Sequence, residues 1–172
     1  MGIFMQSLSF RKPKDKAWKP LKEELTGLLS MYEMDAAQLE REQDTYGLCD
    51  PYGDTFGPET ELLAAAISKA TGDYAVTAQC VDSDFAVVEL YHAGQKIDAG
   101  SICESYEELG FLGKLHPALW LPLLQDPGEE KALENALLED AVFAEDQLKE
   151  LTRLTGLPIF DLDAMLEMDE DF

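Results

Sequence analysis

The stretch Tyr74-Ala-Val-Thr-Ala-Gln-Cys-Val81 opens a series of three β-type runs that decides the fold. The second run is Phe85-Ala-Val-Val-Glu-Leu-Tyr91, and the third is Gln95-Lys-Ile-Asp-Ala99. Short turn segments, Asp82-Ser83-Asp84 and His92-Ala93-Gly94, separate them. Short β-type runs joined by such turns predict an antiparallel three-strand meander over residues 74–99. The middle run is apolar at both alternating positions, which predicts a central strand with helices over at least one face.

Helical patterns lie on both sides of the meander. Apolar residues at helical spacing predict helices over residues 18–34 and 58–70, the second ending at Gly72. In the C-terminal third, Asp126-Pro127 is a typical helix start, and a last helix is expected over residues 145–155, closed by Gly156. Glycine and proline interrupt the apolar segment 111–124, which predicts short turns there instead of one helix.

The remaining segments complete the expected architecture. Residues 3–10 alternate loosely and predict a strand that can join the meander as a fourth strand. Residues 41–57 are rich in glycine and proline and predict a long loop with one short strand near residues 46–49. The fold class is therefore α+β, with an antiparallel sheet, packed helices and a helical C-terminal third.

The length of 172 residues favours a single domain, residues 1–172. The alternative organisation is a helical C-terminal subdomain over residues 104–172 packed on an α+β half. Residues 161–172 are acidic with interleaved apolar residues, and we expect them to form a frayed tail.

The charge is strongly negative and unevenly distributed. The net charge is −22, yet residues 1–24 carry six bases and only three acids. A protein this acidic is not expected to bind nucleic acid, because phosphate contacts require a basic surface. No apolar run approaches the length of a membrane helix, so no membrane partner is expected.

The three cysteines, Cys49, Cys80 and Cys103, are odd in number and widely spaced. This pattern argues against a disulfide framework and fits a reducing cytoplasm, with Cys80 and Cys103 as small core residues. The sequence has no nucleophile elbow, dinucleotide-binding or phosphate-loop motif. His92 and His116 have no recognisable nucleophile nearby. No catalytic residue and no cofactor are therefore assigned.

Two loop segments carry candidate site residues. The loop around residues 46–56 combines three aromatic residues with two acids, and such loops often carry function. Its candidate partner-binding residues are Tyr46, Asp50, Tyr52, Asp54 and Phe56. The alternative is ordinary turn chemistry, with the aromatic residues pinning the loop to the core.

The second segment holds Asp82 and Asp84, two carboxylates around one residue. Such a pair can ligate a divalent cation, but the further acids and the glycine of a calcium-binding loop are absent. Aspartate and serine also form tight turns, so the structural interpretation is a hairpin turn.

Two stretches resemble small cytosolic bacterial immunity proteins that accompany polymorphic toxins. They are Val81-Asp-Ser-Asp-Phe-Ala-Val-Val-Glu-Leu-Tyr-His-Ala-Gly94 and Phe143-Ala-Glu-Asp-Gln-Leu-Lys-Glu-Leu-Thr-Arg-Leu-Thr-Gly156. The resemblance covers about a third of the chain. It implies an inhibitor that binds a toxin domain and carries over no site residue.

We therefore expect a non-enzymatic, acidic binding protein, monomeric and cytoplasmic, whose partner is a basic protein such as a nuclease toxin. Two alternatives stay open. One is a metal-dependent hydrolase that uses Asp50, Asp54, Asp82 or Asp84. The other is an acidic structural domain whose charge serves solubility.

Overall fold

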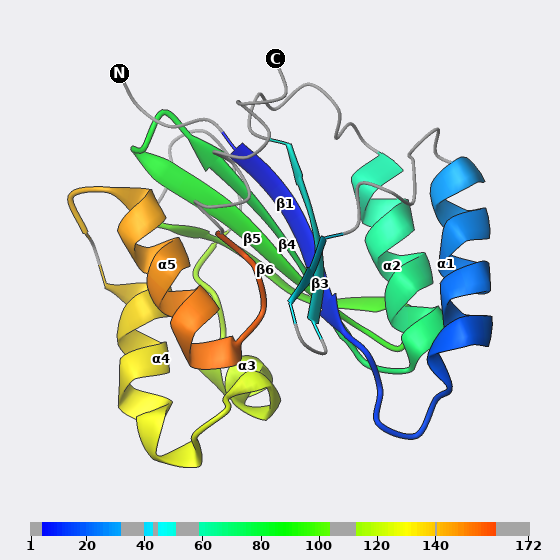
Figure 1. Ribbon diagram of the computed structural model, residues 1–172. Coiled ribbons are helices and arrows are strands. Elements are labelled where there is room, and N and C mark those ends of the chain that lie inside the picture. The colour runs from blue at the N-terminus through cyan, green and yellow to red at the C-terminus, as the bar shows by residue number, and fades with distance from the viewer. Residues whose placement is uncertain are drawn as a thin grey trace.

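The computed structural model describes residues 5–31, 40–42, 45–50, 59–103, 113–139 and 141–160. Its centre is a six-stranded antiparallel sheet (Figure 1). The strands are β1 (Met5–Arg11), β2 (Glu40–Glu42), β3 (Thr45–Asp50), β4 (Tyr74–Val81), β5 (Phe85–His92) and β6 (Gln95–Ile102). Their order across the sheet is β2-β3-β1-β4-β5-β6.

The meander predicted from residues 74–99 is confirmed as β4, β5 and β6, which pair in sequence order. The predicted strand at the N-terminus is confirmed as β1, and it pairs with β4 and also with β3. The short strand expected near residues 46–49 is β3. β2 was not predicted, because three charged residues, Glu40-Arg41-Glu42, carry no apolar alternation.

Helices cover both faces of the sheet, and Figure 1 shows them as two groups. One face carries α1 (Trp18–Met31) and α2 (Glu59–Thr71). The other carries α3 (Pro117–Trp120), α4 (Glu130–Leu138) and α5 (Ala144–Thr155), with 3-10 turns at Leu121–Leu123 and Pro127–Glu129. The α+β class with a helical C-terminal part is thus confirmed.

Each face of the sheet has its own apolar core. Val76, Ala78, Val88 and Leu90 alternate toward α4 and α5 and are fully or almost fully buried there. Leu8, Phe10, Ala75 and Tyr91 point to α1 and α2. Trp120 is fully buried in the first core, and the partly buried Trp18 packs against the second.

Local sequence signals explain the helix ends in the C-terminal part. The Asp126 carboxylate accepts a hydrogen bond from the Gly128 amide at 2.8 Å, as expected of a helix N-cap. Gly156 ends α5 with φ of 71°, a conformation that glycine adopts without steric cost. Pro117 and Pro122 each stand in the first turn of a short helical segment, which confirms the prediction of short turns.

Some predictions fall outside the described residues. These are the last residues of the first helix beyond Met31, Pro58 as the first residue of the second helix, and residues 161–172 as a tail.

Candidate protein-binding surface

The connection between α4 and α5 presents apolar side chains to solvent. Val142 is 83% exposed and Phe143 is 50% exposed, and Leu138 at the end of α4 is also exposed. Most apolar side chains of this size in the described residues are buried in the two cores. Three exposed ones within six residues therefore form a local apolar patch, and such patches often mark binding sites.

The β4–β5 turn docks directly beside this patch. The Ser83 carbonyl accepts a hydrogen bond from the Ala144 amide at 2.8 Å, and the Ser83 hydroxyl donates to Glu145 Oε1 at 3.0 Å. Ala144 and Glu145 form the first turn of α5, whose amides lack partners within the helix. Phe143 is the N-cap residue of α5 and its side chain makes no capping hydrogen bond, so Ser83 supplies these contacts instead. The docking also places Asp82 and Asp84 next to the apolar patch.

We call the combined surface the acidic corner. Its exposed members are Asp82, Asp84, Leu138, Glu139, Val142, Phe143 and Asp146. Lys149 lies beside this surface. Its Nζ is 3.9 Å from the Asp146 carboxylate and 5.4 Å from the centroid of the Phe160 ring. An apolar centre with carboxylates around it matches the anatomy of a protein interface.

α5 is anchored at both ends, which fixes the corner on the sheet. At its C-terminal end, Arg11 of β1 donates to the Thr155 carbonyl and, at 2.5 Å, to the Leu123 carbonyl. Burial lowers the pKa of Arg11, although the negative end of the helix dipole favours a cation there. The Ser7 hydroxyl donates to the Ile159 carbonyl at 2.6 Å and holds the segment that follows α5.

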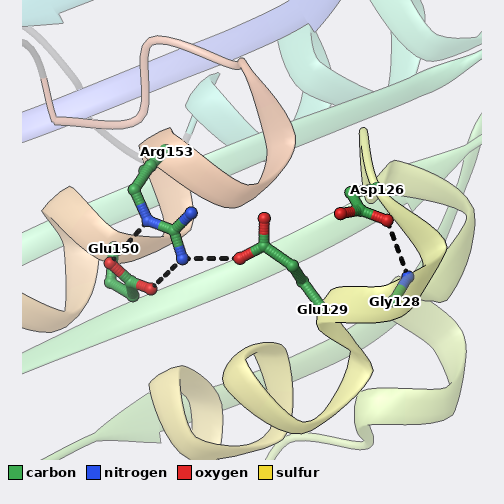
Figure 2. Close-up of polar contacts among 5 residues, drawn as sticks. All are labelled: Asp126, Gly128, Glu129, Glu150 and Arg153. Carbon is green, nitrogen blue, oxygen red and sulfur yellow. Dashed lines mark hydrogen bonds and ion pairs between the residues drawn. The ribbon is translucent and has the colours of Figure 1, made fainter.

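An ion-pair cluster joins α5 to the start of α4 (Figure 2). Arg153 Nη2 lies 2.7 Å from Glu129 Oε2, and Arg153 Nε lies 3.0 Å from Glu150 Oε2. The hydrogen bonds that Arg153 donates to Glu150 and then to Glu129 raise the pKa of Arg153. Exposed pairs of this kind contribute little stability individually.

Cys80 lies in the core, as expected, and is a poor nucleophile. Burial, and after it the carboxylate of Glu145, raise the pKa of the Cys80 thiol to about 11. The reactive form of cysteine is the thiolate, which is scarce at neutral pH when the pKa is this high.

A second polar constellation centres on Asp98 of β6. Its carboxylate is 3% exposed and accepts hydrogen bonds from the Ala99 amide at 3.0 Å, the His116 amide at 2.8 Å and Trp120 Nε1 at 2.8 Å. His116 Nδ1 lies 2.9 Å from Asp98 Oδ1, while the imidazole is 73% exposed. A register shift in the β5–β6 pairing lies immediately before Asp98, and such irregularities change the direction in which a side chain points. The arrangement ties residues 113–120 to the sheet.

The residues predicted as partner-binding are only partly described. Tyr46 and Asp50 belong to β3, where they pair with Phe10 and Gln6 of β1. Tyr52, Asp54 and Phe56 lie outside the described residues. The prediction of a binding loop over residues 46–56 therefore stays a prediction.

Asp82 and Asp84 lie in the hairpin turn between β4 and β5, as the structural interpretation predicted. Asp82 and Ser83 have φ of 51° and 60°, and the Asp84 amide donates to the Val81 carbonyl at 3.1 Å. Within the described ranges, no group of three or more His, Cys, Asp or Glu residues could hold a metal ion. None of the described helices is long and apolar enough to cross a membrane.

Sequence reasoning missed both the apolar centre of the acidic corner and the Asp98 constellation. Comparison of the chain with protein-family profiles, with curated proteins and with solved structures gave no match.

Proposed function

We propose that the protein is an acidic binding protein that recognises a basic protein partner through the acidic corner. The observation that carries this proposal is the exposure of Val142 and Phe143 next to Asp82, Asp84 and Asp146. Buried aromatic anchors supply most of the affinity of an interface, while carboxylates around them attract and orient a basic partner.

The overall charge supports a basic partner. Residues 25–172 carry 32 acids against seven bases, so internal ion pairs leave most of the negative charge uncompensated. Complementary charge accelerates encounter and selects partners, although it contributes less to the lifetime of a complex. The apolar centre is therefore needed for a stable complex.

The two stretches that resemble immunity proteins also meet at the acidic corner. The first contains the β4–β5 turn and the second contains α5, and Ser83 joins them through Ala144 and Glu145. This supports an inhibitor of a basic toxin, such as a nuclease, as the particular form of the function. We place the protein in the cytoplasm, as a monomer, and the free thiols of Cys80 and Cys103 fit that compartment.

The test uses two labelled synthetic peptides of twelve residues, one alternating arginine with leucine and the other arginine with glycine. We expect fluorescence anisotropy to show tighter binding of the arginine–leucine peptide. Phe143→Ser should remove that preference, weakening this peptide about tenfold, which corresponds to about 1.4 kcal/mol of lost apolar contact. Binding of the arginine–glycine peptide should not change.

Met31→Ser is the matched control, because Met31 is 74% exposed but lies on α1, on the other face of the sheet. If wild-type protein binds both peptides equally, or if Met31→Ser acts like Phe143→Ser, the acidic corner is not the binding surface.

A further inference from the structure

One carboxylate of the region is buried beneath the acidic corner. Glu145 is 8% exposed, and its Oε1 accepts the Ser83 hydroxyl at 3.0 Å. Its Oε2 is buried without a hydrogen-bond partner among the described parts of the chain. A buried charge without full pairing is costly, so the free protein holds Glu145 at the expense of stability.

The local structure does not require this carboxylate. An acid in the first turn is favourable at a helix N-terminus, but the neighbouring exposed Asp146 already supplies one. A glutamine at position 145 could still accept the Ser83 hydroxyl through its side-chain oxygen. Neither the helix nor the docking of the turn therefore explains why residue 145 carries a charge.

Glu145 takes part in none of the ion pairs found among the described residues. Cys80 is nearby and neutral, and Asp82, Asp84 and Asp146 lie within one residue of the Ser83–Glu145 contact in the sequence. Oε2 is thus an acceptor in a negative environment, beneath a surface that we have assigned to a basic partner.

We propose that Glu145 determines the specificity of the acidic corner by accepting an arginine side chain of the partner at Oε2. The inference rests on the proposed function and names the group that the partner inserts. Arginine suits this site better than lysine, because its guanidinium is more weakly hydrated than an ammonium group and loses less hydration on entering a buried site. Because Oε2 is buried in the free protein, this contact requires neighbouring side chains to move as the partner docks.

The test compares Glu145→Gln with Asp146→Asn. The two substitutions remove the same charge from neighbouring residues, so long-range attraction falls equally in both variants. Without any partner, Glu145→Gln should raise the melting temperature by about 2–4 °C, the shift expected from about 1 kcal/mol in a chain of this size. Asp146→Asn loses an exposed pair with Lys149 and an exposed acid in the first turn of α5, so it should leave the melting temperature unchanged or slightly lower it.

Binding of the twelve-residue arginine–leucine peptide is the second readout. We expect Glu145→Gln to weaken it about tenfold, because a hydrogen-bonded charge pair is lost, and Asp146→Asn to weaken it about twofold. When Glu145 is replaced, a lysine–leucine peptide should lose less binding affinity than the arginine–leucine peptide.

The outcomes separate this inference from the proposed function. If Phe143→Ser weakens peptide binding but Glu145→Gln and Asp146→Asn weaken it equally, Glu145 contributes only to the overall negative charge. The inference about Glu145 then fails, while the proposed function stands. If Phe143→Ser has no effect, the proposed function fails. A lower melting temperature for Glu145→Gln would show that the free protein already satisfies the carboxylate, and this would overturn the inference.

Discussion

Val88→Asp is expected to unfold the protein at room temperature, whereas Val87→Asp should leave it folded. Val88 is 0% exposed and lies in the core between the sheet and the C-terminal helices, where it pairs with Ala78 and Gly100 in the neighbouring strands. A carboxylate there would be buried without a partner, at a cost of several kcal/mol out of a total stability of about 5–15 kcal/mol.

Val87 points to the opposite face and is only partly buried, beside the exposed Gln79 and the half-buried Ser101. Aspartate at this position stays hydrated, and its low strand propensity costs about 1 kcal/mol or less. Urea unfolding followed by circular dichroism measures both variants. Equal loss of stability at the two positions would contradict the assignment of the core face of β5.

Asp98→Ala should be the second most damaging of the substitutions considered. It removes the acceptor for Trp120 Nε1 and for the His116 amide, each at 2.8 Å, and Trp120 is fully buried. Each buried donor left without a partner costs about 1–3 kcal/mol, so we expect a total loss of about 3–5 kcal/mol.

His116→Ala is the matched control. The imidazole is 73% exposed, so water replaces its contact with Asp98, and the loss should stay below about 1 kcal/mol. Denaturant unfolding of both variants gives the comparison. If His116→Ala costs as much as Asp98→Ala, the imidazole rather than the buried donors holds the segment 113–120 to the sheet.

The meander and the helices could be predicted because their patterns are local. The short β-type runs of β4 and β5, the proline after Asp126 and the glycine at position 156 each predict the structure of their own segment. β2 carries no such pattern, because its hydrogen bonds with β3 come from the backbone and its side chains are all charged.

The candidate sites depend on contacts between distant segments, and periodicity carries no information about those. Val142 and Phe143 look like core residues in the sequence, and only their exposure in the structure identifies them as surface. The pairing of Ser83 with Glu145 spans 62 positions, and that of Asp98 with His116 spans 18. Asp82 and Asp84 were correctly placed in a turn, but their position beside α5 could not be inferred.

Photocrosslinking from the acidic corner in the host cell identifies the protein that binds this surface. Benzoylphenylalanine replaces Phe143, which is 50% exposed, in one variant and Met31 of α1, which is 74% exposed, in a control. We expect the Phe143 position to capture a basic protein that the Met31 position does not.

The captured protein is then purified and its association with the wild-type chain is followed by stopped flow. The association rate constant should fall about tenfold or more between 50 and 500 mM sodium chloride, while the dissociation rate constant changes far less. Capture of the same proteins from both positions, capture of a neutral or acidic partner, or an association rate constant that does not depend on salt would show that the acidic corner does not bind a basic partner.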